Sequence, residues 1–296
     1  MNLDLSIANV VFILLIVPFA LLMEGVRRKV IARMQHRVGP PVWQPFYDVL
    51  KLLKKGETRS LANENWFYRW TPFLYFITTI VLFMFIPLAM LSFEYDFILL
   101  IYLLVLDSAL YVLAGFASNN PYSTIGSMRE MVVMVCYEMI FTVAIVAVMV
   151  AEKATSLAEI GNSFILFKVP LAAICLFYVV LIEVRVTPYD TVEAGTEILE
   201  SVKTEYYGRN LAYMELSKDL KTTFFAMLWI FLFIGVHNIL LFLALTVLMV
   251  WVLGFTQATT CRYRLDQVLK RYTFVLGIAL FELARIMLFG GGFAWT

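Results

Sequence analysis

The sequence contains few of the residues that hold redox cofactors. Its 296 residues include only three cysteines, Cys136, Cys175 and Cys261, which lie far apart along the chain. An iron–sulfur cluster needs several cysteine thiolates, so this chain is not expected to bind one. The two histidines, His36 and His237, fall in predicted connections, whereas a haem-binding bundle needs paired histidines on facing helices. An iron–sulfur protein and a haem-bearing membrane bundle are therefore excluded.

Sequence motifs for other cofactors are missing as well. The chain has no Walker loop, no dinucleotide-binding fingerprint and no zinc-protease motif. Only 15% of its residues are charged, its formal net charge is +1, and no nucleic acid partner is expected. We predict that the chain binds no metal or cofactor itself, and that any redox chemistry belongs to partner subunits.

The composition is instead that of an integral membrane protein. Apolar residues make up 62% of the chain and aromatic residues 16%, well outside the range of soluble domains. A spanning helix needs about 20 mostly apolar residues, because its backbone must satisfy its own hydrogen bonds in the bilayer. We predict an all-α membrane protein with about eight transmembrane helices, at residues 7–23, 71–92, 97–117, 131–150, 168–183, 222–236, 239–255 and 272–289. The polar sequence from Gly235 to Asn238 separates the sixth and seventh spans at a predicted tight hairpin.

Positive charges are distributed unevenly between the predicted connections. Segments 24–70, 118–130, 184–221 and 256–271 carry about 10, 1, 5 and 4 Lys and Arg residues, whereas the rest of the chain carries only three. Loops rich in Lys and Arg face the cytoplasm. We therefore predict four cytoplasmic loops in a single polytopic domain, residues 1–296, in the cell membrane. With an even number of spans, both termini lie on the external side.

The first cytoplasmic segment contains a basic helix followed by an amphipathic one. Lys29, Arg33 and Arg37 recur at i, i+4 and i+8, as a stripe on a helix that continues the first span until a Gly-Pro-Pro sequence at 39–41 ends it. A second helix, between residues 41 and 55, is predicted to lie in the interface plane. Its apolar face consists of Trp43, Phe46, Tyr47, Leu50 and Leu53. Such a helix anchors the chain to lipid, covers a cavity or docks a soluble arm, and the sequence leaves these alternatives open.

An acidic segment follows the fifth span. Its five carboxylates are Asp190, Glu193, Glu197, Glu200 and Glu205. If a helix begins after the proline at 188, the first four share one face at i, i+3, i+7 and i+10. Repulsion between them would raise some of their pKa values and allow proton exchange near neutral pH. Most such runs are solvated acidic surfaces, so both interpretations stay open.

Two carboxylates fall inside the predicted spans. Asp107 lies midway in the third span and Glu138 a third of the way into the fourth. A charge inside the bilayer is costly and usually faces the bundle interior or an aqueous path. Because no Lys or Arg lies inside the first seven apolar cores, a protonatable relay is favoured over structural ion pairing. Glu282 and Arg285, at i and i+3 in the last span, are predicted to form an ion pair.

Four segments, taken in order, carry a resemblance to one family of membrane subunits. They are Glu24 with Arg27 to Pro40, Gln44 to Lys55, Glu183 to Arg209 with its Glu-Tyr-x-Gly ending, and Arg262 to Gln267. The chain resembles the subunit 1 family of respiratory complex I and its relatives, the membrane-bound group 4 NiFe hydrogenases. Its short first loop and total length are similar to the hydrogenase or sulfur-reducing branch, whereas the Asp-Gln pair at 266–267 is similar to complex I.

The resemblance implies a non-catalytic membrane anchor in a hetero-oligomeric oxidoreductase complex. Such an anchor joins a cytoplasmic redox arm, with hydrogenase-like large and small subunits and an iron–sulfur subunit, to antiporter-like subunits that translocate protons or sodium ions. Iron–sulfur clusters and a NiFe-type centre would lie in those partners. The implied proton path uses Asp107, Glu138, Glu183, Asp190, Glu193, Glu197, Glu200 and Glu205. The implied docking surface for the arm, or vestigial quinone chamber, uses Arg27, Arg33, Gln35, Arg37, Gln44, Asp48, Arg262, Arg264 and Asp266.

Two alternative functions stay open. The first is a quinone-binding subunit of a complex I that oxidises NADH or ferredoxin, in which quinone would be bound. The second is a stand-alone secondary transporter, which would be expected to contain an internal repeat with discontinuous helices. No convincing repeat relates the two halves of this sequence.

Overall fold

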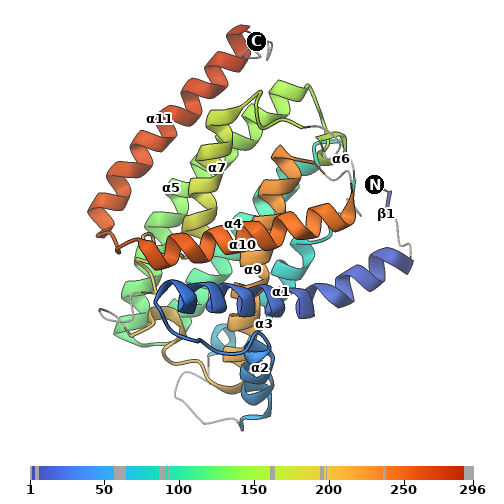
Figure 1. Ribbon diagram of the computed structural model, residues 1–296. Coiled ribbons are helices and arrows are strands. Elements are labelled where there is room, and N and C mark those ends of the chain that lie inside the picture. The colour runs from blue at the N-terminus through green and yellow to red at the C-terminus, as the bar shows by residue number, and fades with distance from the viewer. Residues whose placement is uncertain are drawn as a thin grey trace.

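The computed structural model is a bundle of helices and describes residues 2–3, 7–56, 65–86, 91–92, 94–160, 164–193, 197, 199–235 and 238–289. The long helices in these ranges are α1 (Ile7–Met34), α3 (Trp66–Leu82), α4 (Asp96–Ala117), α5 (Pro121–Glu152), α7 (Pro170–Glu183), α9 (Gly208–Phe233), α10 (Ile239–Thr259) and α11 (Leu265–Phe289) (Figure 1). Shorter elements are α2 (Gln44–Lys54), α6 (Leu157–Ile160), the 3-10 helix η2 (Ser201–Lys203), and the antiparallel pair β1 (Asn2–Leu3) and β2 (Leu91–Ser92).

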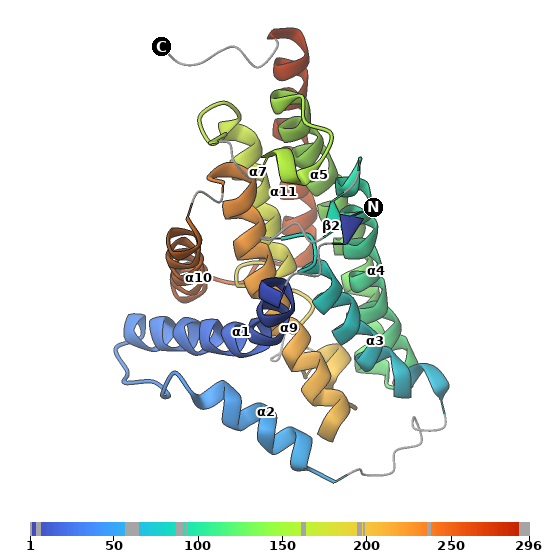
Figure 2. The ribbon, with the colours of Figure 1, turned by 90° about the vertical axis from the view of Figure 1, so that its right-hand side faces the viewer.

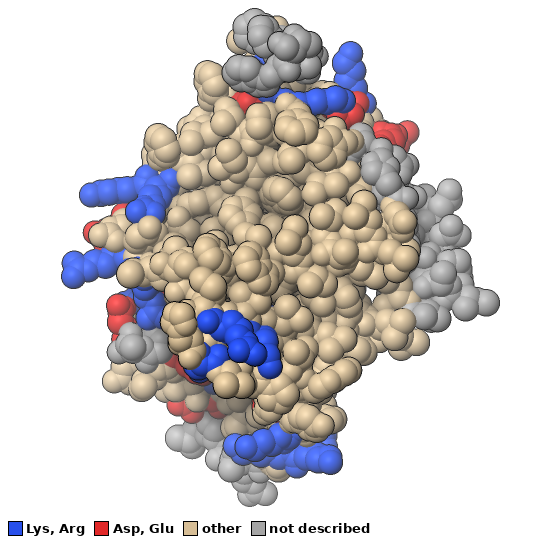
Figure 3. All heavy atoms as spheres, in the orientation of Figure 1, with Lys and Arg blue, Asp and Glu red and all other residues tan. Residues whose placement is uncertain are grey.

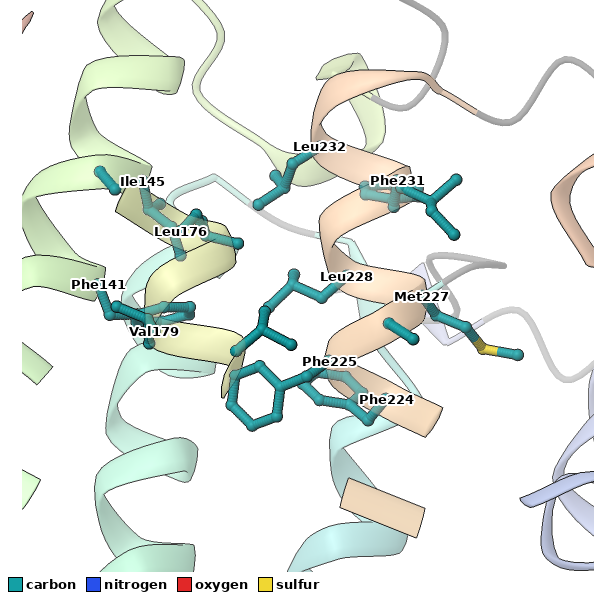
Figure 4. Close-up of a cluster of buried hydrophobic side chains, with 14 of the residues drawn as sticks. Phe141, Ile145, Leu176, Val179, Phe224, Phe225, Met227, Leu228, Phe231 and Leu232 are labelled. Atoms are coloured by element: carbon teal, nitrogen blue, oxygen red, sulfur yellow. The ribbon is translucent and has the colours of Figure 1, made fainter. Parts of the chain in front are cut away.

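The central element of the bundle is α9. It packs against α1, α2, α3, α7 and α10, and most of its residues are buried. A helix enclosed on all sides is apolar all round, as the run from Thr222 to Phe233 is. Figure 4 shows Phe225 and Leu228 of α9 facing α7, where Leu176 and Val179 lie. This packing fixes the position of the polar residues that precede the run on the same helix.

Two helices lie across the others. In both ribbon views α1 and α10 are roughly perpendicular to α9 (Figures 1 and 2), and they pack against one another. The predicted separation of the sixth and seventh spans is confirmed, because α9 ends at Phe233 and α10 begins at Ile239, where Asn238 caps the helix by accepting from the N–H of Leu240. The predicted hairpin geometry is wrong, since α10 crosses α9 instead of running back along it. Residues 236–237, which include the second histidine, lie outside the described residues.

The helices match a membrane protein in composition. Within the described ranges, α4, α5 and α10 are long and apolar enough to span a membrane, and α7 is a shorter apolar helix. Each of the eight predicted spans coincides with one long helix over much of its length, but the count of eight stays a prediction. Figure 3 shows a broad uncharged surface between charged side chains at the top and along the lower left of the molecule. An uncharged zone between two charged regions is typical of a bundle embedded in lipid.

The basic extension of the first helix is confirmed, but its end differs from the prediction. Helix α1 continues to Met34 and closes at His36, whose φ of 57° is left-handed. The N–H of His36 donates to the carbonyl of Arg33, and that of Arg37 to the carbonyl of Ala32. This is a Schellman-type ending, so the helix stops before the Gly-Pro-Pro sequence.

The amphipathic helix α2 is also confirmed, with its apolar face divided in two. Val49 is buried, and Phe46 and Leu53 pack with it against α1 and α9. The side chains of Trp43, Tyr47 and Leu50 point away from the bundle and are exposed. Helix α2 therefore both covers the protein interior and presents an apolar surface to its surroundings.

Candidate functional site

A group of buried charges gathers around Glu193 of the acidic segment. The Glu193 carboxylate accepts hydrogen bonds from the Arg185 guanidinium at 3.4 Å and the Tyr111 hydroxyl at 3.3 Å. The ammonium of Lys203 lies 3.2 Å from Glu193 Oε1, and the ammonium of Lys218 contacts Oε2. Elements from four parts of the chain therefore place three cations on a single carboxylate.

The end of α7 directs Arg185 into this group. Helix α7 ends at Glu183, and Arg185 has a left-handed φ of 53°. The N–H of Val186 donates to the carbonyl of Leu181, again a Schellman-type ending. The Arg185 guanidinium lies 3.5 Å from the centre of the Tyr111 ring and donates to Glu130 Oε1 at 2.7 Å. A non-glycine residue in this conformation costs roughly 1 kcal/mol, which the ion pair with Glu130 offsets.

These side chains form what we call the outer cluster. The ammonium of Lys203, in η2, also contacts Glu215 Oε1 of α9 at 3.0 Å. The outer cluster consists of Glu130, Arg185, Glu193, Lys203, Glu215 and Lys218. Three carboxylates and three cations balance its charge, which is the condition under which buried ionised groups are retained.

The charge balance decides the protonation of the acidic segment. Burial alone would raise the pKa of Glu193, but Lys203, Lys218 and Arg185 outweigh it and hold that pKa well below its usual range. Burial together with Glu193 raises the pKa of Asp190, although Arg262 acts against the shift. The expectation that neighbouring carboxylates raise one another's pKa values therefore has the right direction for Asp190 and is wrong for Glu193.

A second group, the inner cluster, lies deeper in the bundle around Lys221 of α9. The Lys221 ammonium is 2.9 Å from Asp107 Oδ2 of α4 and 3.0 Å from Glu183 Oε2 of α7. The hydroxyls of Thr78 and Thr79 donate to Asp107 Oδ1, each at 3.0 Å. All three charged side chains are almost fully buried. Because Lys221 lies one residue before the predicted sixth span, the expectation that Asp107 has no basic partner is wrong.

Glu138 lies beside the inner cluster without joining its ion pairs. It lines a void of about 10 Å³ together with Glu183 and Tyr137. The Tyr137 hydroxyl donates to Ser108 Oγ at 2.9 Å, and the Lys221 ammonium donates to the same oxygen at 3.4 Å. Glu138 Oε1 is buried and has no hydrogen-bond partner among the described residues. A void of this size is close to the space that one water occupies.

The two clusters are joined through one turn of α9. Lys218 contacts Glu193 in the outer cluster, and Lys221, at i+3 on the same face, contacts Asp107 and Glu183 in the inner one. Polar and charged side chains thus continue from the acidic segment to Glu138. A displacement of charge at one end is felt at the other, because buried charges are weakly screened.

The remaining acids of the segment lie at the rim and have separate partners. Asp190 pairs with Arg262 at 2.6 Å. Glu197 pairs with Arg129 at 2.9 Å, and Glu205 accepts from the Asn120 side chain at 2.6 Å. Glu200 is exposed at the surface. The predicted helix after the proline is wrong for residues 188–193, which form turns and extended backbone, and residues 194–196 and 198 lie outside the described residues.

The basic residues predicted for docking lie in three different settings. Arg27 is buried, donating to Glu24 at 2.6 Å and to Gln257 at 2.8 Å. Arg28, which is not among the predicted residues, joins Glu24 to Asp48 of α2. Four of the predicted residues are exposed: Arg33, Gln35, Arg37 and Asp266. Gln44 donates to Asp48, while Arg262 and Arg264 line a cleft of about 250 Å³ beside Thr191.

Sequence reasoning missed most of the cations that neutralise the acids. In the sequence, Arg185, Lys203, Lys218 and Lys221 count only as positive charges of one loop. A signal existed in the spacing of Lys218 and Lys221, which places two positive charges on one face just before an apolar run. The predicted pair of Glu282 and Arg285 is confirmed at 2.8 Å.

The acid-rich regions do not have the geometry of a metal site. In the part of the chain that the structure describes, no group of three or more His, Cys, Asp and Glu side chains could hold a metal ion. These acids are instead neutralised by Lys and Arg.

Comparison with known proteins places the chain in a family. A model of the NADH dehydrogenase family matches residues 7–287. A membrane subunit of the NADH-quinone oxidoreductase of Carboxydothermus hydrogenoformans is 30% identical over 277 residues, which cover 87% of this chain and 78% of that protein. Hydrogenase-4 component C of Escherichia coli is 28% identical over 238 residues, or 77% of this chain and 74% of that protein. The chain therefore belongs to the NADH dehydrogenase family, as the resemblance predicted.

A solved structure has the same fold. One chain of the membrane-bound sulfane sulfur reductase, an archaeal respiratory membrane complex, superposes with a TM-score of 0.84 at 27% identity. The match covers 93% of this chain and 97% of that chain. The fold is thus common to members of hydrogenase, quinone reductase and sulfur reductase complexes.

Proposed function

We propose that this chain is the membrane anchor and ion-coupling subunit of a complex I-related respiratory complex of the hydrogenase or sulfur reductase type. It is a membrane subunit, and its relatives belong to multi-subunit membrane complexes. In the proposal, partner subunits form a cytoplasmic arm with iron–sulfur clusters and a NiFe-type centre, and antiporter-like subunits bind laterally. The chain spans the membrane eight times with both termini outside, and its segments 24–70, 118–130, 184–221 and 256–271 face the arm.

The observation that carries the proposal is the continuous charged path from Glu193 to Glu138. A protein that only anchored a soluble arm would have no need of a buried Lys221 between two carboxylates, because buried ion pairs add little to stability compared with apolar packing. Retaining them is understandable when their charge state has a role.

In the proposed mechanism the two clusters have different tasks. The outer cluster stays ionised and senses a change of charge or shape in the docked arm through the acidic segment. Movement of Glu193 shifts Lys218, and with it the field at Lys221. The inner cluster answers by exchanging a proton between Asp107, Glu183 and Glu138, with one water in the small void linking the last two.

The rim residues would dock the arm. Arg264 lines the cleft beside Thr191 and is exposed, so its guanidinium is available to an acidic or backbone group of a partner. Arg33, Gln35 and Arg37 offer a second contact at the exposed end of α1. Arg27, which is buried, fits the wall of an internal chamber and not a docking surface.

The test replaces Glu138 by glutamine in the intact complex reconstituted into liposomes. The E138Q variant is expected to retain assembly and electron transfer while ion translocation falls at least tenfold, because the amide cannot carry a proton. E152Q is the matched control, since Glu152 lies on the same helix but pairs with Lys168 near the opposite end. Unchanged translocation per electron in E138Q would refute the role.

A quinone-reducing complex is the second candidate, and one observation favours it. The buried group of Glu24, Arg27 and Gln257 lies between α1 and α10, with Asp219 of α9 close enough to interact electrostatically with Arg27. Such a polar group inside an apolar bundle would suit a quinone headgroup. Inhibition of the intact complex by a quinone analogue, relieved in R27Q, would favour this candidate. Hydrogen or sulfide formation driven by reduced ferredoxin and insensitive to the analogue would favour the first.

A further inference from the structure

A cleft of about 480 Å³ opens between the N-terminal ends of α3 and α9. It shares no lining residue with the outer or inner cluster. Arg69 and Arg209 line it together with the aromatic side chains of Trp70, Phe73 and Tyr213. Figure 2 places these helix ends at the lower end of the molecule, next to α2. The site is therefore separate from the proposed ion path.

The polar part of the cleft is strongly suited to an anion. Arg69 and Arg209 are exposed, and neither pairs with a carboxylate within the described part of the chain. Guanidinium groups bind phosphate through paired hydrogen bonds and are the usual choice for this purpose. Each arginine lies in the first turn of its helix, where free backbone N–H groups and the helix dipole add positive potential.

The apolar part of the cleft continues along the outer surface of α3. Phe67, Trp70, Leu74 and Ile77 recur at i, i+3, i+7 and i+10, and between 39% and 54% of each side chain is exposed. This surface begins at the arginines and runs toward the middle of the helix. Tryptophan and tyrosine at such a boundary are typical of the headgroup level of a bilayer.

A basic helix lies on the other side of the cleft. Gly208, the first residue of α9, is so near the end of α2 that a Cβ there would lie 3.3 Å from the backbone carbonyl of Lys55. Lys51 and Lys54 are on the same end of α2 and are exposed. These lysines extend the positive potential around the two arginines, at the membrane face that the charge distribution makes cytoplasmic.

We propose that this cleft binds an anionic phospholipid. Arg69 and Arg209 hold the phosphate of the headgroup, Asn210 donates to its oxygens, and an acyl chain lies along the exposed face of α3. An acidic peptide of a partner would account for the two arginines, but it would leave the apolar surface next to them uncovered. Lipid accounts for both parts with one ligand.

The test measures retained lipid in the intact complex by native mass spectrometry. The complex is stripped of lipid with detergent and then titrated with phosphatidylglycerol or phosphatidylcholine. The wild-type complex is expected to bind phosphatidylglycerol, and the double variant R69Q/R209Q to bind it roughly tenfold more weakly, since each basic residue near a membrane surface contributes about 1 kcal/mol. Phosphatidylcholine binding is expected to be the same in both.

Control variants separate charge, hydrogen-bond geometry and folding. R69K/R209K keeps the charge but not the planar donors, and its affinity is expected between those of wild type and R69Q/R209Q. K29Q/K270Q removes two positive charges from the same predicted face outside the cleft and is expected to bind as wild type does. Thermal stability of each complex is measured in parallel. Equal binding in wild type and R69Q/R209Q, with both complexes intact, overturns the proposal.

Two further measurements identify the source of the phosphate. A large excess of inorganic phosphate is expected not to displace the lipid, because free phosphate has no contact with α3. A photoreactive benzoylphenylalanine in place of Phe73 is expected to capture phospholipid in the intact complex. Displacement by free phosphate, or capture of a partner polypeptide in place of lipid, would overturn the assignment.

Discussion

The outer and inner clusters differ in how their charges are balanced. In the outer cluster one carboxylate, Glu193, contacts three cations, and the whole group has as many acids as bases. In the inner cluster two carboxylates, Asp107 and Glu183, share a single ammonium, and Glu138 lies beside them. A balanced buried group is most stable when fully ionised, whereas a group with excess acid reaches neutrality by binding a proton. The difference separates a fixed electrostatic element from one that can exchange protons.

The largest expected effect is the loss of the only cation in the inner cluster. K221M leaves two buried carboxylates without a partner, and breaking a buried ion pair in this way costs about 3–5 kcal/mol. We expect a marked loss of assembled complex and of thermal stability, measured by size-exclusion chromatography after heating. Adding D107N and E183Q to K221M removes the unpaired charges and is expected to restore most of the stability. A stable K221M single variant would contradict the description of this cluster.

The next effect concerns the single carboxylate at the centre of the outer cluster. E193Q removes the anion from Lys203, Lys218 and Arg185, and loss of charge-assisted hydrogen bonds costs about 2 kcal/mol. The matched control is E197Q, because Glu197 pairs with Arg129 in a largely exposed setting and such pairs contribute less than about 1 kcal/mol. Equal melting temperatures for the two variants would remove the distinction between the buried centre and the rim.

Local features of the fold could be predicted from the sequence because their causes are local. The basic continuation of α1, the amphipathic α2, the break between α9 and α10, and the pair of Glu282 and Arg285 each depend on residues a few positions apart. Helical spacing brings such residues together in any context. The angle between α9 and α10 does not follow from the break itself. It depends on the packing of α10 against α1.

The charge pairing could not be predicted, because it depends on contacts between distant segments. Lys221, Asp107 and Glu183 come from three helices, and nothing in the sequence near any one of them identifies the other two. The acids of both clusters stand out in the sequence, whereas the cations that decide their protonation do not. For Glu193 the omission reversed the expected direction of the pKa shift.

A smaller effect distinguishes two lysines of the outer cluster. Lys203 is almost fully buried between Glu193 and Glu215, whereas Lys218 is partly exposed to solvent. K203M is expected to lower stability by roughly 1–2 kcal/mol, and K218M by less than about 1 kcal/mol, because solvent screens the more exposed ion pair. Chemical unfolding in mild detergent measures both. A larger loss in K218M would move the centre of the cluster toward α9.

The smallest effect near neutral pH is expected for the ionisation of Glu193. Its pKa is lowered in the folded protein, so the stabilisation it provides is fully present above the pKa of an unfolded glutamate, about 4.3. The stability difference between wild type and E193Q should therefore be constant from about pH 5 to 8. It should decline only as the pH falls through the lower folded pKa. A difference that already shrinks on going from about pH 8 to 6 would mean that Glu193 titrates near neutrality, and the outer cluster would then exchange protons as the inner one does.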